Sequence, residues 1–306
     1  MIDRLRAATD TAPCVSDRTP VEHERLWWPP MRILIVGGSG FLGGELARRC
    51  LTAGHEVAGT YLTRSGEIAG VEWSPLDVRR REEVGALIGA LRPEVVINAA
   101  FRQTDWATTA VGAVNVALAA SAAGGRLVHV SSDAVFSGAA IRYDETCVPD
   151  PITPYGAAKA AAETAVDAIV PNSAVVRTSL IIGDGGSPHE ALVHRLAGGG
   201  VRGTLFTDDV RCPVHVADLA AALLELASSE YHGIHHVAGA DAVSRYELGL
   251  LIARRDGLDA DKVPSGLRSE AGLPGPMDVR LRCDMTQGRL RTELRGARQF
   301  LGEGHR

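Results

Sequence analysis

The chain has 306 residues, which is enough for one large α/β domain or for a nucleotide-binding domain with a smaller lobe. Its net charge of -5 and the lack of a basic cluster argue against nucleic acid or an anionic membrane surface as the main partner, so we expect a small-molecule ligand. The five cysteines are scattered and show no Cys-x-x-Cys spacing, which favours reduced thiols, a cytoplasmic protein and no bound metal.

Residues 1–30 lack hydrophobic periodicity and the apolar centre of a signal peptide, so we predict a disordered extension. Met31 immediately precedes the first predicted strand, and we expect translation to start there. No apolar run reaches the roughly 18–20 residues that a membrane span needs.

A buried strand is predicted at 33–36, and glycines at three-residue spacing follow before a helix begins. Such a turn allows a dinucleotide diphosphate to approach the backbone, where N–H groups at the helix start bind phosphate. The alternative is a glycine turn that serves only packing. The predicted cofactor contacts here are Gly37, Gly40, Phe41, Leu42 and Gly43.

The second predicted strand, 54–61, ends at Tyr61 without the acidic residue that would favour NAD. Arg64 follows, and its planar guanidinium can pair with a 2′-phosphate, although it can equally be an ordinary solvated charge. We therefore predict NADPH as the cofactor, with NADH as the alternative, and place Tyr61 and Arg64 among its contacts.

The third predicted strand, 71–78, ends at Asp77 and Val78, which we also place beside the cofactor. Asp77 has two interpretations. Its carboxylate accepts a hydrogen bond from the adenine amino group, or it caps the helix predicted over 80–91.

The fourth predicted strand, 93–100, ends in Asn98, Ala99 and Ala100. Small side chains at this edge leave space for a ribose or the nicotinamide, whereas Asn98 alternatively bonds only neighbouring backbone. The next helix is largely apolar, so the polar Asn115 within it needs a hydrogen-bond partner.

A fifth strand over 126–132 brings Ser132 to a strand end, and the repeated alternation of strands and helices predicts a Rossmann-type doubly wound parallel sheet of the α/β class. Tyr155 and Lys159 then lie four residues apart at a helix start, so the ammonium can lie beside the phenol and lower its pKa from about 10. With Ser132 nearby, Tyr155 is the predicted acid of a hydride transfer.

Together, the glycine turn, Asn98-Ala-Ala, Ser132 and the Tyr155-x-x-x-Lys159 pair resemble the extended short-chain dehydrogenase/reductase family. More narrowly, most of residues 31–301 resembles the dTDP-4-dehydrorhamnose reductase branch. The segments that carry this narrower resemblance are 130–138, 176–183 and 208–220.

The resemblance implies that Ser132 hydrogen-bonds the substrate carbonyl and that Tyr155 donates the proton. It implies that Lys159 holds the nicotinamide ribose, and that Asn115 supports this lysine, often through water. NADPH would then deliver a hydride to C4 of a nucleotide-linked 4-keto-6-deoxyhexose.

Three positions depart from this branch. Ala134 stands where these reductases usually have a tyrosine that touches the sugar, Leu180 where they have a tryptophan, and Gly275 where they have an arginine. Each departure removes a substrate contact, so the chemistry is better supported than the identity of the sugar.

Glycine-rich runs after residue 182 predict that a Rossmann domain over 31–182 is followed by a smaller substrate-binding lobe. The lobe would comprise 183–213 and 239–306, while 214–238 returns to the Rossmann domain. We expect amphipathic helices over 246–256 and 287–301. Ser132, Asp133 and Arg211 form the predicted substrate-binding set. A nucleotide diphosphate could be neutralised by His194, Arg195, Arg202 or Arg211, and the alternative for each is an ordinary solvated charge. The resemblance favours Arg211, because its segment crosses the substrate cleft in the related reductases.

Two other functions remain open. One is a regulatory protein that keeps the cofactor fold without catalysis, like the β subunit of methionine adenosyltransferase. The changes at Ala134 and Leu180 favour it, and the intact Ser132, Tyr155 and Lys159 oppose it. The other is a sugar-nucleotide epimerase or dehydratase, which would retain its NAD tightly. We expect a monomer or a homodimer.

Overall fold

The computed structural model describes residues 29–302, so the predictions for residues 1–28 lie outside the described residues. The larger body contains a seven-stranded sheet of order β12-β7-β5-β4-β1-β2-β3, in which every pairing is parallel. This confirms the doubly wound fold. The strands are β1 (Arg32–Val36), β2 (Glu56–Tyr61), β3 (Val71–Pro75), β4 (Val95–Asn98), β5 (Arg126–Ser132), β7 (Ala174–Thr178) and β12 (Gly233–Val237).

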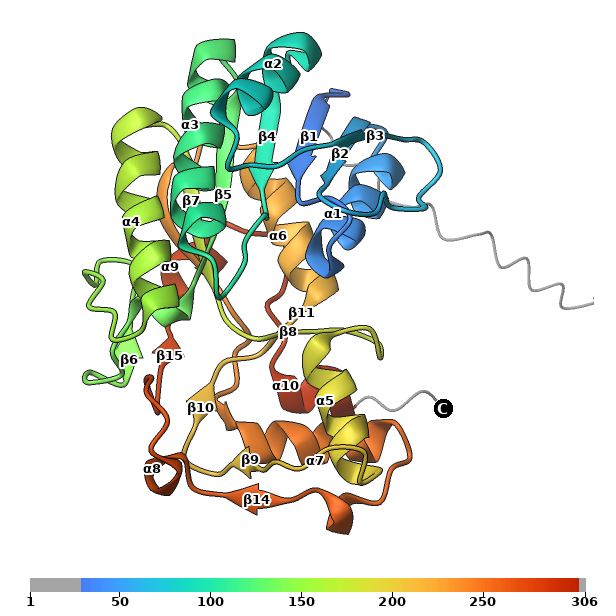
Figure 1. Ribbon diagram of the computed structural model, residues 1–306, viewed down its shortest axis with the longest axis vertical. Coiled ribbons are helices and arrows are strands. Elements are labelled where there is room, and N and C mark those ends of the chain that lie inside the picture. Colours follow the sequence, from blue (N-terminus) through green and yellow to red (C-terminus); the bar gives the residue numbers. More distant parts are fainter. Residues whose placement is uncertain (1–28, 303–306) are drawn as a thin grey trace, which may run out of the picture.

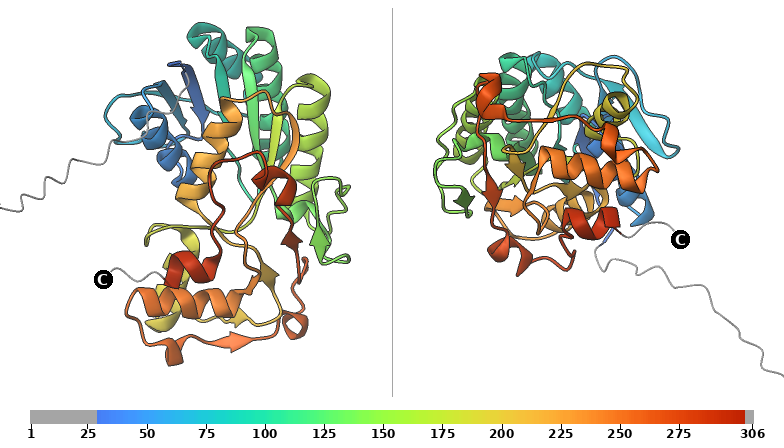
Figure 2. Two further views of the ribbon diagram at one scale, coloured as in Figure 1. Left: turned by 180° about the vertical axis from the view of Figure 1, so that it is seen from behind. Right: turned by 90° about the horizontal axis from the view of Figure 1, so that it is seen from below.

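Helices cover both faces of this sheet (Figures 1 and 2). Ile33 and Ile35 of β1 pack with one face and Leu34 and Val36 with the other, which is why β1 needs four consecutive apolar residues. On the first face lie α1 (Phe41–Thr52) and α6 (Val216–Ala227). On the second face lie α2 (Arg81–Leu91), α3 (Gly112–Ala123) and α4 (Pro154–Ile169), and a short π-helix, η1 (Ala107–Val111), precedes α3.

A smaller lobe lies below the sheet in the view of Figure 1. The chain leaves β7 for this lobe, so the carboxyl ends of the strands face it. Its helices are α5 (Pro188–Ala197), α7 (Arg245–Arg255), η3 (Ala260–Lys262), α8 (Arg268–Ala271) and α10 (Ala297–Gly302). Its short strands are β8 (Ile181–Ile182), β9 (Leu205–Phe206), β10 (Val210–Arg211), β11 (Val214–His215), β13 (Val243–Ser244) and β14 (Ser265–Gly266). Val193, Leu248, Ile252 and Phe300 belong to its own buried core.

The prediction of a helix over 287–301 is wrong. A short helix, α9 (Asp284–Gln287), stops at Gly288, and a segment without regular structure leads to α10. The side-chain amide of Gln287 binds the backbone of Thr292 and Leu294, and the carboxylate of Glu225 accepts from the N–H of Arg291 at 2.7 Å. These bonds satisfy the backbone without a helix. In the larger body, β15 (Arg280–Leu281) pairs with β6 (Arg142–Tyr143), and α9 packs against β12.

Candidate active site

The turn between β1 and α1 is built from glycine because side chains do not fit there. Gly37 has a φ of +82°, and a Cβ on Gly43 would lie 2.3 Å from the Gly37 carbonyl oxygen. Gly40 is the N-cap of α1, which starts with no side-chain cap and no acid in its first turn. The site therefore fits a dinucleotide diphosphate, to which the half-buried Phe41 and the core residue Leu42 would offer backbone N–H groups.

The end of β4 lies directly against this turn. A Cβ on Gly37 would lie 2.9 Å from the Ala100 nitrogen and 3.2 Å from the Ala99 carbonyl carbon. The buried Asn98 accepts a hydrogen bond from the Ala100 N–H at 3.2 Å, and its Nδ2 lies 3.3 Å from His129 Nδ1. Asn98 therefore bonds neighbouring backbone and shapes the loop whose small residues border the turn.

The end of β2 presents a cation to solvent. Tyr61 is half-buried as the last residue of β2, and Arg64 is exposed in the loop that follows it. Arg64 is accessible to an anionic group bound along this edge, as the prediction of a 2′-phosphate partner requires.

Asp77 lies in the connection between β3 and α2, and the interpretation that it caps α2 is wrong. The N-cap of α2 is Arg80, whose side chain makes no capping bond. The Asp77 carboxylate instead accepts from the Arg79 N–H at 3.0 Å and from its guanidinium at 2.7 Å. The hydrogen bond from Arg79 lowers the pKa of Asp77 to about 2. The neighbouring Val78 is buried.

Ser132 ends β5 and starts a 3₁₀ turn, η2 (Asp133–Val135). Its hydroxyl accepts from the Ala134 N–H and donates to Asp133, both at 3.2 Å. The buried Asp133 also accepts from the Ser179 hydroxyl at 2.7 Å and lies 3.7 Å from Arg211 Nε. Through Ser179 and Arg211, Asp133 connects the ends of β5 and β7 to the lobe.

The start of α4 places Tyr155 beside the turn that follows β5. Thr153 is the N-cap, its hydroxyl accepting from the Gly156 N–H at 3.0 Å, and Pro154 occupies the first helical position. The start of α4 packs so closely against the turn after β5 that a Cβ on Gly156 would lie 2.0 Å from the Ala134 carbonyl oxygen. Tyr155 is half-buried there and has a hydrogen-bond contact with the Ser132 side chain.

Lys159 lies one turn further along α4 and is only 2% exposed. Its ammonium donates to the Val130 carbonyl at 2.8 Å. Burial lowers the pKa of Lys159 to about 8, while Glu163 acts in the opposite direction. Burial also raises the pKa of Tyr155 well above 10, against the effect of the Ser132 hydrogen bond. The predicted lowering of the Tyr155 pKa by Lys159 is therefore wrong for this structure.

Asn115 is buried in α3, and its partner is a backbone carbonyl. Its amide donates to the Val78 carbonyl at 2.9 Å, whereas the Lys159 ammonium donates to Val130. The side chains of Asn115 and Lys159 therefore donate to different carbonyls. In the described residues, the hydrogen bond of Asn115 joins α3 to the connection between β3 and α2.

Arg211 is 5% exposed and its guanidinium is already engaged. One terminal nitrogen lies 2.9 Å from an Asp209 oxygen, and the other donates to the Pro276 carbonyl at 2.6 Å. Its role as a diphosphate ligand remains a prediction, while these contacts hold β10 against residues 276–277.

Two further arginines, not singled out from the sequence, surround the same carboxylate. Arg245 Nε lies 3.6 Å from Asp209, and Arg268 forms an ion pair with it at 2.5 Å. Both line a cavity of about 230 Å³ in the lobe, together with Phe206 and His189. Three guanidiniums lie near the two carboxylates of Asp209 and Asp133, so one positive charge is in excess. No sequence spacing links residues 209, 245 and 268, because the folded lobe alone brings them together.

A buried ion pair supports α4 below Lys159. Glu163, four residues after Lys159, contacts Arg177 of β7 at 2.8 Å and accepts from the Ser131 hydroxyl at 2.5 Å. The sequence signal for Glu163 was an acid in an alanine-rich helix, four residues from the lysine. Its contacts fix the position of α4 relative to β5 and β7.

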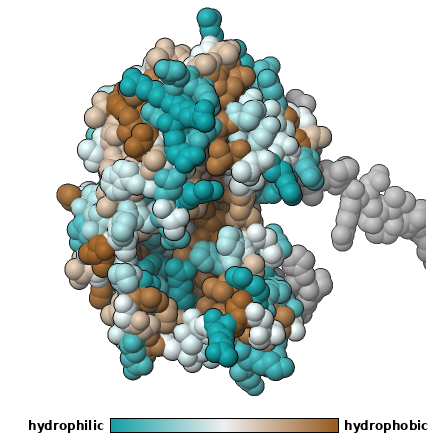
Figure 3. Space-filling model, in the orientation of Figure 1, coloured by the Kyte–Doolittle hydropathy of each residue, from teal (hydrophilic) through white to brown (hydrophobic). Residues whose placement is uncertain are grey.

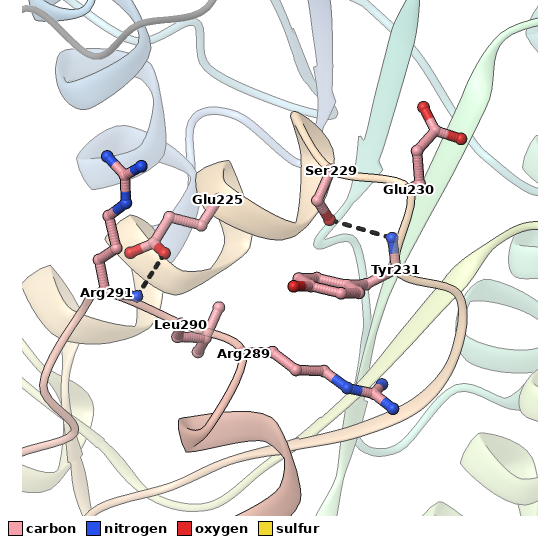
Figure 4. Close-up of a pocket in the computed structure, with 7 residues that line it drawn as sticks. All are labelled: Glu225, Ser229, Glu230, Tyr231, Arg289, Leu290 and Arg291. Atoms are coloured by element: carbon pink, nitrogen blue, oxygen red, sulfur yellow. Dashed lines mark hydrogen bonds between the residues drawn. The ribbon is translucent and has the colours of Figure 1, made fainter.

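The surface is hollowed between the larger body and the lobe (Figure 3). A separate cavity of about 360 Å³ lies where α6 leads into β12, lined by Glu225, Tyr231 and Arg289 with Leu290 (Figure 4). It is at the amino end of β12 and is therefore remote from the carboxyl edge of the sheet. Across residues 29–302, no helix has the length and apolarity to span a membrane, and no cluster of His, Cys, Asp or Glu could hold a metal ion.

Comparison with known proteins identifies the relatives of this chain. The family model described as "RmlD substrate binding domain" matches residues 31–303. The chain is 32% identical over 262 residues to the dTDP-4-dehydrorhamnose reductase of Mycobacterium tuberculosis, covering 80% of this chain and 82% of that protein. It is 29% identical over 256 residues to methionine adenosyltransferase 2 subunit beta of Xenopus laevis, covering 78% and 74%.

Among solved structures, the fold matches dTDP-4-dehydrorhamnose reductase from Bacillus anthracis in complex with NADP. The TM-score is 0.76 at 24% identity, over 90% of this chain and 99% of that one. The likeness confirms the Rossmann-like α/β fold.

Proposed function

The chain belongs to the family of the RmlD substrate binding domain, and we propose that it is an NADPH-dependent oxidoreductase that reduces the 4-keto group of a dTDP-linked 6-deoxyhexose. The observation that carries this proposal is the meeting of Ser132, Tyr155 and Lys159 at the carboxyl edge of the sheet, beside the glycine turn. A parallel α/β sheet binds its ligands at this edge.

The cofactor would be held along one edge of the sheet. The glycine turn and the start of α1 would bind its diphosphate, and Arg64 would pair with the 2′-phosphate. Ala99 and Ala100 would border the nicotinamide ribose. NADPH, when bound, supplies the hydride.

The proton comes from Tyr155. Burial keeps its phenol neutral at ordinary pH, which is the state a proton donor needs. The Ser132 hydroxyl and the Tyr155 phenol would both donate hydrogen bonds to the carbonyl oxygen of the substrate. Two donors would therefore stabilise the negative charge that develops on this oxygen as the hydride is transferred. Lys159, held by the Val130 carbonyl, would stabilise the tyrosine oxygen after its proton has left.

The nucleotide part of the substrate would bind toward the lobe. Arg245 and Arg268 contribute positive charge around Asp209, at the cavity between α5, α7 and β9. A diphosphate carries the charge to complement this cluster. Arg211 would act mainly by holding β10 in place, and Asp133 by connecting Arg211 to the end of β5.

Oxidation of NADPH, followed by absorbance against a panel of nucleotide-linked 4-ketosugars, tests this function. We expect turnover with at least one dTDP-linked 4-keto-6-deoxyhexose, and no turnover across the panel would refute the proposal. A monomer or a homodimer remains our prediction for the assembly.

A second candidate is a regulatory subunit that binds the cofactor without turnover. The similarity to methionine adenosyltransferase 2 subunit beta supports it, as do Ala134 and Leu180 in place of aromatic residues. Tight NADPH binding without any NADPH oxidation across the panel of 4-ketosugars would favour this candidate. Tightly retained NAD after purification would instead favour an epimerase or a dehydratase.

A further inference from the structure

An exposed aromatic ring lies over the Tyr155–Lys159 pair. Phe101 follows Ala100 directly in the connection from β4 to η1, and 56% of its surface is exposed. Its ring centroid lies 5.4 Å from Lys159 Nζ and 6.1 Å from the ring centroid of Tyr155, with the ring planes inclined by 49°. Single exposed aromatics are common on protein surfaces, but this ring contacts both members of the proposed proton-transfer pair.

The ammonium of Lys159 needs such a neighbour. It has lost almost all contact with water, and among the described residues its hydrogen-bond acceptor is the Val130 carbonyl. An ammonium has three donors, so one acceptor leaves it incompletely solvated. The face of an aromatic ring within about 6 Å attracts a cation through its quadrupole.

The other groups around Lys159 come from α4 and β5. Glu163 on α4 carries negative charge but is paired with Arg177, and Tyr155 on α4 is a neutral phenol. His129 on β5 is fully buried, and burial lowers its pKa to about 3, so its imidazole is neutral. From the connection after β4, the contact with the ammonium is the Phe101 ring.

We propose that Phe101 is a positioning residue of this site, whose ring attracts the Lys159 ammonium through its π face. The ammonium is thereby kept charged and in place for the moment when Tyr155 loses its proton. Only the effect of Phe101 on turnover rests on the proposed function, because its effect on the ammonium is measurable without any substrate.

The composition of the chain makes this contact directly observable. Only two of the 32 basic residues are lysines, Lys159 and Lys262. Lysine labelled with ¹³C at Cε therefore gives two NMR signals, which the variant Lys262→Arg assigns. The Lys262 side chain is 66% exposed and serves as the internal reference during a pH titration.

Two substitutions of Phe101 separate the ring from its volume. Phe101→Leu keeps an apolar side chain without a π face, and Phe101→Tyr keeps the ring. We expect the pKa of Lys159 to fall by about half a unit in Phe101→Leu and to stay unchanged in Phe101→Tyr. An unchanged or raised value in the leucine variant, or an equal fall in the tyrosine variant, would overturn the proposal.

The matched control is Trp106→Leu. Trp106 is 51% exposed and lies in the same connection, five residues further on. We expect its substitution to leave the Lys159 signal unmoved. An equal shift would show a general effect of the connection and would overturn the specific role of Phe101.

Kinetics then separate the two proposals. If the enzyme reduces a 4-ketosugar, its kcat should decline as Lys159 loses its proton, and Phe101→Leu should move this decline about half a pH unit lower. A shifted NMR titration with an inactive wild-type protein would refute the proposed function and support the role of Phe101. Turnover with an unmoved NMR titration would refute the role of Phe101 alone.

Discussion

Replacing Gly156 by alanine should separate Tyr155 from Ser132 without touching either. The added Cβ would lie 2.0 Å from the Ala134 carbonyl oxygen and 3.0 Å from Pro151 Cβ. Real Cβ contacts are essentially never shorter than 3.0 Å and ordinary contact begins at 3.4 Å, so the start of α4 and the turn after β5 must separate by about 1.0–1.4 Å, the difference between these values and 2.0 Å. Gly156 has no positive φ, and the effect is therefore steric.

A displacement of this size is large for a proton donor. Misplacing a catalytic group by about 1 Å costs on the order of 100-fold in rate, so we expect a loss of this order in kcat. Overpacking should lower the free energy of unfolding by about 1–3 kcal/mol, or roughly 2–4 °C in Tm for each kcal/mol. Steady-state oxidation of NADPH and thermal unfolding measure the two effects.

Gly85→Ala is the matched control, because a Cβ on Gly85 within α2 meets no atom within 4 Å. Alanine is the better helix former, so this variant should be fully active and about 0.5–1 kcal/mol more stable. Wild-type kcat and Tm in Gly156→Ala would refute the close packing of α4 on the turn after β5, and with it our account of how Tyr155 is positioned.

Three further predictions address the cofactor, the support of α4 and pH. Arg64→Ala should raise KM for NADPH roughly tenfold and leave KM for NADH unchanged, because a charge-assisted contact to the 2′-phosphate is lost; equal effects on both cofactors would contradict this role. Glu163→Gln should lower the free energy of unfolding by about 3 kcal/mol in urea titrations, since it leaves the buried Arg177 guanidinium unpaired; an unchanged midpoint would count against it. Burial lowers the pKa of His129 to about 3 and of His235 to about 4, so below the unfolded value of about 6.5 only the unfolded chain takes up these protons. The free energy of unfolding should therefore fall as pH decreases from 6.5 to 4, by about 1.4 kcal/mol per pH unit for each imidazole, and a flat pH profile would contradict their neutral burial.

Local features of the site were accessible from the sequence. The glycine turn was predicted because its requirements are local: Gly37 adopts a left-handed φ, and Gly43 packs against a residue six positions earlier. Four consecutive apolar residues in β1 likewise indicated a strand with both faces buried. The spacing of Tyr155 and Lys159 placed both on one side of α4, where Phe101 contacts the phenol ring of Tyr155 and the ammonium of Lys159.

Features that depend on distant contacts were not accessible. The i, i+4 spacing predicted a lowered pKa for Tyr155, but the burial that raises it comes from elements separated along the chain. The spacing of Leu290 and Leu294 is typical of a helix. The side chains of Gln287 and Glu225 nevertheless accept hydrogen bonds from the backbone N–H groups of this segment, which forms no helix. Competition between local hydrogen-bond partners explains the wrong interpretation of Asp77, whose carboxylate accepts from its near neighbour Arg79 instead of capping α2.

The central claim is that the phenol of Tyr155 protonates the carbonyl that receives the hydride. The most direct test is Tyr155→Phe, measured by single-turnover oxidation of NADPH with a dTDP-linked 4-keto-6-deoxyhexose and by NADPH affinity. We predict a rate lower by about 100-fold or more, with cofactor affinity within a few-fold of the wild type. A variant that oxidises NADPH at the wild-type rate would contradict the claim.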